Sequence, residues 1–140
     1  MNALLSVIIM VTITNSNPGS PNASYAWSFQ SDTPGVDSTT GSFALPGPGE
    51  TQITYELDSV SAQTYQLVYV NLDPQPAATL QIESVSTDPA GTFVTITDRN
   101  SSDPAGANTF SLQLVARKLN DSGSGFLSPD PQVTNNPNIP

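Results

Sequence analysis

The sequence predicts an all-β domain, an immunoglobulin-like antiparallel β-sandwich of seven or eight strands. Short apolar runs rich in Val, Ile, Thr, Tyr and Phe alternate with polar residues at the two-residue period of a strand. The 13 prolines and 9 glycines interrupt these runs repeatedly, which favours many short strands over helices. Asp-Pro pairs begin at Asp73, Asp88 and Asp103, fifteen residues apart. Two of them extend to Asp-Pro-Ala-Gly, which suits a type I turn closed by glycine.

The first expected strand, Leu4–Ile13, is the most apolar segment of the chain. Val7 to Ile13 alternate along one face, and Ile8 and Met10 make the other face apolar too, so we expect cover on both sides. A signal peptide is the alternative. No Lys or Arg precedes the run and no small-residue cleavage site follows it, so a strand and a cytoplasmic protein are favoured over a secreted one. At about ten residues the run is also too short to span a bilayer as a helix.

The remaining strands follow from alternation and from the breakers between them. They are expected at Ser24–Gln30, Ser42–Leu45, Thr51–Asp58, Thr64–Val70, Ala78–Val85, Thr92–Asp98 and Asn108–Lys118. The apolar positions that should share one face of their strand are Tyr25, Trp27 and Phe29; Ile53, Tyr55 and Leu57; Tyr65, Leu67 and Tyr69; Leu80 and Ile82; Val94 and Ile96; and Phe110, Leu112 and Leu114. Aromatic residues at this spacing favour a core strand over an exposed sugar-binding platform.

The sandwich domain is expected to span residues 1–120. After Asn120 the apolar residues are scattered, so 121–140 is expected as an irregular tail, either packed on the sandwich as a strap or partly disordered.

Composition excludes several classes of function. The chain has no cysteine and no histidine, which excludes a thiolate site, a Ser-His-Asp triad and a histidine-built zinc centre. The net charge is −9, with Arg99, Arg117 and Lys118 as the three basic residues. We therefore expect no nucleic-acid partner and no anionic membrane partner. No cofactor is expected.

Two groups of polar residues are candidate sites. Oxygen-bearing residues that alternate as at the start of a calcium loop are Asp98, Asn100, Ser102 and Asp103. The sixth and twelfth positions lack the Gly and Glu of an EF-hand, so a polar loop is favoured and calcium is a weak candidate. Glu56, Asp58 and Glu83 would have to meet in a cleft to act as paired carboxylates, and solvated strand faces explain them more simply. We therefore expect no enzyme and no catalytic residues.

Three segments resemble a small bacterial group, the DP-EP family. The closing motif is DPQVTNNP at 130–137, and the looser matches are ITYEL at 53–57 and VTITDRN at 94–100. The positions that carry the closing motif are Asp130, Pro131, Asn135 and Pro137. Where the family name implies a Glu-Pro pair, this chain has Asn136-Pro137. The resemblance implies a compact β-sandwich of unassigned function, with no catalytic residues to carry over.

The function expected from the sequence is non-enzymatic binding or self-association. An edge strand with two apolar faces invites a partner, so we expect a homo-oligomer formed through the N-terminal strand; a protein partner is not identified by the sequence. The alternative is a secreted or surface adhesion module that binds carbohydrate or calcium.

Overall fold

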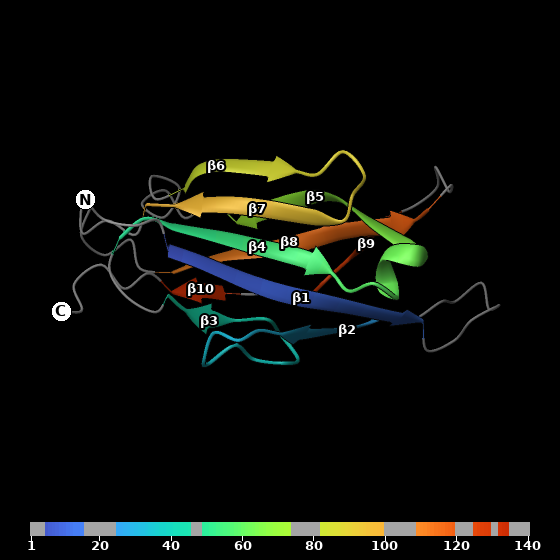
Figure 1. Cartoon of the computed structure of the whole chain (residues 1–140), viewed down its shortest axis with the longest axis horizontal. Helices are drawn as coiled ribbons and strands as arrows, with labels where there is room; N and C mark the ends of the chain where they lie inside the picture. Colours follow the sequence, from blue (N-terminus) through green and yellow to red (C-terminus); the bar gives the residue numbers. More distant parts are fainter. Residues whose placement is uncertain are drawn as a thin grey trace.

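Two β-sheets pack face to face in the computed structural model (Figure 1). The structure describes residues 5–15, 25–45, 49–73, 82–99, 109–119, 125–129 and 132–134. The strands in this part of the chain are β1 Leu5–Asn15, β2 Tyr25–Gln30, β3 Phe43–Ala44, β4 Thr51–Leu57, β5 Tyr65–Asp73, β6 Ile82–Thr87, β7 Phe93–Asp98, β8 Thr109–Lys118, β9 Phe126–Leu127 and β10 Gln132–Thr134. A 3-10 turn, η1 Ser61–Gln63, connects the two sheets between β4 and β5. The all-β sandwich prediction is confirmed, with ten described strands instead of seven or eight.

The first sheet has the order β2-β1-β4-β7-β6. Its β1 pairs antiparallel with β2 and parallel with β4. The prediction of a purely antiparallel sandwich is therefore wrong. Between β1 and β4 the chain visits β2 and then β3 of the second sheet, and this long excursion permits a parallel return beside β1.

The second sheet has the order β3-β10-β8-β5, and β9 pairs with β8 as well. Both β9 and β10 come from the 121–140 segment, and both pair antiparallel with β8. The tail thus supplies two short strands to the second sheet. A domain boundary at residue 120 stays a prediction.

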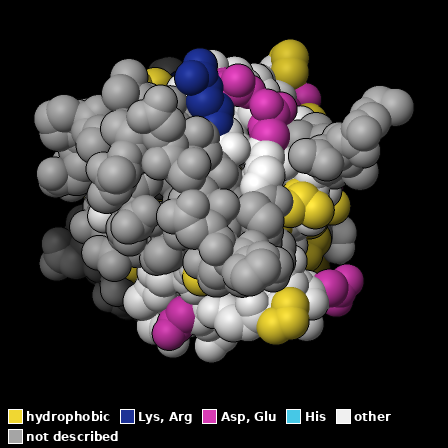
Figure 2. All heavy atoms as spheres, turned by 90° about the vertical axis from the view of Figure 1, so that its left-hand side faces the viewer, with side chains coloured by type: hydrophobic (Ala, Val, Ile, Leu, Met, Phe, Trp, Pro, Cys, Tyr) yellow, Lys and Arg dark blue, Asp and Glu magenta, His cyan; other side chains and the backbone are white. Residues whose placement is uncertain are grey.

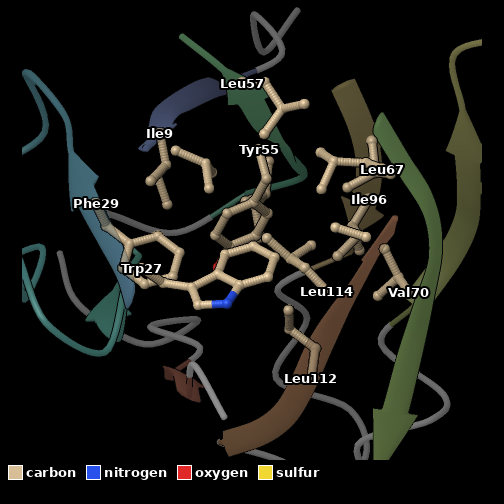
Figure 3. Packing of buried hydrophobic residues seen from close by; sticks show 14 of the residues in the cluster. Ile9, Trp27, Phe29, Tyr55, Leu57, Leu67, Val70, Ile96, Leu112 and Leu114 are labelled. Atoms are coloured by element: carbon tan, nitrogen blue, oxygen red, sulfur yellow. The ribbon is translucent and has the colours of Figure 1, made fainter. Parts of the chain in front are cut away.

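The core lies between the sheets and follows the predicted alternation in four strands. Val7 to Ile13 in β1, Ile53 to Leu57 in β4 and Val94 with Ile96 in β7 bury every second side chain, and so do Leu112 and Leu114 in β8. In Figure 3 Trp27, Phe29 and Tyr55 of the first sheet point toward Leu112 and Leu114 of the second. Burial of these apolar side chains is the main stabilising contribution to the fold.

The outer face of β1 differs from the prediction. Ile8 is 51% exposed, so the strand is covered on one side only. The strand is also not an edge, because β2 and β4 flank it. The premise on which an oligomer through the N-terminal strand was expected is therefore wrong.

Two β-bulges change which side chains face the core. In β5 the register with β8 shifts between Leu67 and Tyr69, so Val70 turns inward and Tyr69, expected inside, is 60% exposed. In β6 the register with β7 shifts between Ile82 and Ser84. An extra residue in one strand reverses the alternation beyond it. The bulges therefore place Tyr69 at the surface and Val85 on the inner side of its sheet, opposite Ile96.

The Asp88 turn has the predicted type I chemistry. The Gly91 amide donates to the Asp88 carbonyl over 2.8 Å, and the Thr92 amide and hydroxyl donate to the Asp88 carboxylate over 3.2 and 2.6 Å. These bonds from Thr92 lower the pKa of Asp88. The turn also joins the two sheets, because the Leu67 amide of β5 donates to the Gly91 carbonyl over 2.7 Å. The turns at Asp73-Pro74 and Asp103 to Gly106 lie partly or wholly outside the described residues.

Candidate functional site

The calcium candidates are described at one position only. Asp98 ends β7 with a fully buried side chain, on the same inner face as Val94 and Ile96. The other candidates, Asn100, Ser102 and Asp103, lie outside the described residues. Within the described ranges no three acidic, histidine or cysteine side chains are grouped to hold a metal ion. Calcium binding by this loop stays a prediction.

The three carboxylates weighed as an acid–base group are not brought together. Asp58 and Glu56 lie at the end of β4, whereas Glu83 lies near Asp98, which pairs with Thr51 at the start of β4. The seven residues of β4 span about 20 Å at the usual rise per residue, so the two groups are far apart. The arrangement provides no pair of close carboxylates from these residues.

Asp58 instead organises the connection between the sheets. Its carboxylate accepts hydrogen bonds from the Thr12 hydroxyl, over 2.5 Å, and from the Ser61 amide, over 2.7 Å. The Ser61 hydroxyl in turn accepts a hydrogen bond from the buried Ile13 amide over 2.9 Å. Partial burial raises the pKa of Asp58, but the bonds from Thr12 and Ser61 outweigh it and hold the pKa below its usual value.

Charged side chains of opposite sign meet where β6 begins. The Arg99 guanidinium lies 3.3 Å from the Glu83 carboxylate, and both side chains are exposed. A hydrogen bond between the Glu50 and Glu83 carboxyls raises the pKa of Glu50. Figure 2 looks at the end of the molecule where β6 starts, and in this view a basic side chain lies beside acidic ones. Exposed ion pairs of this kind contribute little to the unfolding free energy.

The aromatic residues of β2 belong to the core, as predicted. Trp27 and Phe29 are buried, and Tyr25 stacks on Phe126 of β9 with ring centroids 3.7 Å apart. The indole nitrogen of Trp27 and the hydroxyl of Tyr55 are buried without a hydrogen-bond partner among the described residues. Burial also raises the pKa of the Tyr55 hydroxyl far above its usual value.

The closing motif surrounds a strand of the second sheet. Its four marked positions, Asp130, Pro131, Asn135 and Pro137, lie outside the described residues. Between them β10 pairs with β3 and β8, and Val133 is fully buried. Val133 of the motif therefore packs in the core.

Three sheet edges of the described residues, at β2, β3 and β5, carry features that hinder pairing with another chain. At β2, the loop after the strand covers the edge, since the Phe29 amide donates to the Ser38 carbonyl over 2.9 Å. In the second sheet, the edge strand β3 is only two residues long and so offers little main chain for pairing. The β5 edge carries a bulge and the docked turn at Leu67. Coverage, shortness and bulges are the usual ways in which proteins block sheet edges.

The fourth edge, at β6, is more accessible. The Asp88 amide donates to the Phe93 carbonyl over 2.9 Å. In an antiparallel pair every second residue forms main-chain hydrogen bonds with the neighbouring strand, so Ser86 and Ser84 are the next residues of β6 that bond to β7. The amide and carbonyl groups of Val85 and Thr87 then point away from the sheet. We call this side of the strand the β6 edge. The strand contains no Lys, Arg or Pro, and Glu83 is its one charged residue.

A groove of about 280 Å3 lies beside the β6 edge. It is lined by Tyr69, Val70, Asn71, Val85 and Thr87, and we call it the edge groove. Val85 and Thr87 line it from the inner face of β6, and the other three residues line it from β5. Val85 is 40% exposed although it faces the inner side, so the sandwich is open here. The lining carries no charge. It combines the aromatic ring of Tyr69 and the aliphatic side chains of Val70 and Val85 with the amide of Asn71 and the hydroxyl of Thr87.

These features define a class of protein: a small acidic β-sandwich in which, among the described residues, the edge at β6 is accessible beside an uncharged groove. No helix of the described residues is long and apolar enough to cross a membrane. A comparison with protein-family models matches the DP-EP family over residues 7–137, nearly the whole chain. The chain belongs to the DP-EP family. No curated protein matches the sequence.

The structure places the two loosely matching segments on neighbouring strands. ITYEL at 53–57 forms most of β4, and VTITD at 94–98 forms most of β7. These strands pair with each other in the first sheet, with Ile53 opposite Ile96. The two motifs that the sequence separates by some forty residues are therefore neighbours in the core.

Proposed function

We propose that this protein is a non-enzymatic binding module that takes up an extended polypeptide segment along the β6 edge. The observation that carries the proposal is the outward direction of the Val85 and Thr87 main-chain groups on an edge strand beside the edge groove. In strand addition, main-chain hydrogen bonds supply affinity and every second guest side chain supplies specificity. Here those side chains would reach the edge groove, beside Tyr69 and Asn71.

The lining of the groove favours a particular kind of segment. An uncharged groove selects small apolar or polar side chains at alternate guest positions, because a buried unpaired charge is costly. The net charge of −9 disfavours acidic segments and favours neutral or basic ones.

A proline substitution tests the proposal because it removes one outward amide. Val85→Pro deletes the N–H that a guest strand would bond, while the bonds of Ser84 and Ser86 to β7 remain. Val85→Thr keeps the amide and the branched shape and serves as the matched control. Peptides selected from a random display library against the wild-type chain are titrated against both variants by fluorescence anisotropy. We expect at least a tenfold loss of affinity in Val85→Pro and little change in Val85→Thr; equal binding by both variants would contradict strand addition.

A carbohydrate-binding adhesion module is the second candidate. The exposed Tyr69 ring beside the Asn71 amide and the Thr87 hydroxyl favours it, because sugars offer both apolar faces and hydroxyl groups. A panel of neutral sugars, and calcium separately, is tested by thermal shift. A ligand held by the folded state alone raises the melting temperature. A rise with a sugar that Tyr69→Ala abolishes would favour this candidate over strand addition.

Three finer assignments belong to the same proposal. We propose an immunoglobulin-like subclass for the sandwich, a bacterial source and a cytoplasmic location. The two-sheet arrangement supports the first of these. Fractionation of cells that express the chain with its natural flanking sequence tests the location.

A further inference from the structure

We propose that the segment bound at the β6 edge is the β6 edge of a second copy of this chain, so that two first sheets join into one continuous sheet. This inference rests on the proposed function and adds the identity of the partner. A two-fold axis through the paired strands would make the contact isologous, as in most homodimers.

The residues of β6 are compatible with pairing to themselves. In an antiparallel pair centred on Val85, each Val85 faces its copy and Ser84 faces Ser86 of the second copy, whereas Glu83 lies in the bulge beyond this regular stretch. No like charges stand directly opposite each other, and a β-branched pair occupies the centre, which is a favourable cross-strand combination. The phase of the main chain also agrees, since Val85 and Thr87 both present their amide and carbonyl groups outward.

The edge groove gives this pairing an apolar component. A two-fold axis perpendicular to the sheet keeps the inner faces of both copies on the same side. The two Val85 side chains would then adjoin beneath the joined sheet, with an edge groove and a Tyr69 ring on either side. The exposed parts of Val85 and Tyr69, 40% and 60%, would be reduced together.

The other edges of the molecule explain why the partner is placed at β6. Within the described residues, the edges at β2, β3 and β5 are covered, short or bulged. At β6 the bulge and Glu83 lie at one end of the strand, and Ser84–Thr87 remains regular. A contact of one short strand is small, so we expect a weak dimer with a dissociation constant of about 10 μM to 1 mM.

Charge predicts an unusual dependence on salt. Each copy carries −9, so the two copies repel each other at low ionic strength. Salt screens this repulsion, whereas main-chain hydrogen bonds are little affected. The dimer should therefore strengthen when NaCl is raised from about 20 to 500 mM, over which the screening length becomes several-fold shorter.

Sedimentation equilibrium of the full chain between about 5 μM and 1 mM tests the inference over the expected range of affinity. We expect a monomer–dimer equilibrium that tightens with salt and that weakens at least tenfold in Val85→Pro. Thr87→Pro, which removes the other outward amide, is the second blocking variant, and Val85→Thr is the control that should dimerise normally. Fluorescence of the buried Trp27 and the melting temperature establish that each variant is folded.

A charge substitution tests the register. In the Val85-centred pair Ser84 faces Ser86 of the second copy, so Ser84→Glu with Ser86→Lys in one chain sets opposite charges against each other and should tighten the dimer, whereas Ser84→Lys with Ser86→Lys sets cations against each other and should weaken it. Equal effects of the two double variants would overturn this register.

The partner and the proposed function fail in different ways. A strict monomer at the highest concentration in 500 mM NaCl, or a dimer that both proline variants leave unchanged, would overturn the second copy as partner. Selected peptides that still bind the wild-type chain and not Val85→Pro would then preserve strand addition to a different protein. Loss of both results would overturn the proposed function as well.

Discussion

Replacing Gly91 by alanine should destabilise this fold more than the same change at any exposed glycine. Gly91 has φ +77°, in the left-handed region, and is buried beneath β5. A Cβ at this position would lie 2.6 Å from Cβ of Gln66 and 3.0 Å from the Leu67 carbonyl oxygen. Gln66 has little freedom to move, since its side-chain oxygen accepts a hydrogen bond from Arg117 over 2.8 Å.

The magnitude follows from two separate costs. The left-handed conformation costs a non-glycine residue about 1–2 kcal/mol. Forcing a methyl group into a packed contact costs about 1–3 kcal/mol more. The sum, about 2–5 kcal/mol, is a large part of a typical unfolding free energy of about 5–15 kcal/mol. The change would also pull the Gly91 carbonyl from the Leu67 amide and so loosen the junction of the sheets.

Gly35 provides a matched control. Its φ is +85°, and a Cβ there would meet nothing within 4 Å. Gly35→Ala should therefore show the conformational cost alone, about 1–2 kcal/mol. The difference between the two variants isolates the contact between the Asp88 turn and β5.

Urea unfolding and thermal unfolding, both followed by the fluorescence of Trp27, the single tryptophan, measure the unfolding free energy and the melting temperature of each variant. Gly91→Ala should lower the melting temperature by about 4–20 °C, at the usual 2–4 °C per kcal/mol for a domain of this size. Equal losses in Gly91→Ala and Gly35→Ala would refute the packing of this turn against β5.

Three further outcomes are expected from buried polar groups. Ser61→Ala removes the acceptor of the buried Ile13 amide and should lower the unfolding free energy by about 1–3 kcal/mol. Tyr55→Phe removes a buried hydroxyl without a described partner and should leave stability unchanged or raise it by about 1 kcal/mol. Hydrogen bonds from Thr12 and Ser61 lower the folded-state pKa of Asp58, so their stabilisation is complete at neutral pH and is lost as the pH falls through that lowered pKa.

Each of these outcomes has its own comparison. Ser59→Ala, at an exposed neighbouring position, should change stability by less than about 0.5 kcal/mol. Tyr69→Phe removes an exposed hydroxyl and should be neutral, so a large loss in Tyr55→Phe would show that its hydroxyl is satisfied. In urea titrations at a series of pH values, Asp58→Asn should reduce the loss of unfolding free energy at acid pH. An unchanged loss would assign the acid sensitivity to other carboxylates.

The sequence predicted the strands that alternate without interruption. Ile53 to Leu57 and Val94 with Ile96 show period-2 patterns on both faces, and the structure buries the expected side chains. The Asp88 turn was equally predictable, because its residues satisfy one another locally. These features depend on neighbours within a few residues.

The features that define the candidate site depend on distant contacts. The run Leu67-Val68-Tyr69-Val70 is apolar on both faces, so no pattern marks where the bulge reverses the alternation and exposes Tyr69. The apolar faces of β1 likewise look the same for an edge strand and for a strand beside a parallel neighbour. Strands of two or three residues such as β9 and β10 are too short to show a period. The signal that could have pointed to the β6 edge was the composition of Ser84–Thr87, which lacks the lysine or proline of a protected edge.

The central claim, that the β6 edge binds an added strand, is tested most directly by amide hydrogen exchange at single residues. The isotope-labelled chain is followed by NMR while a selected peptide, or the chain itself, is raised in concentration. The amides of Val85 and Thr87 should become protected, whereas those of Ser84 and Ser86, already bonded to β7, should change little. Protection that arises elsewhere, or exchange at Val85 and Thr87 that stays fast when the partner is saturating, would contradict the account.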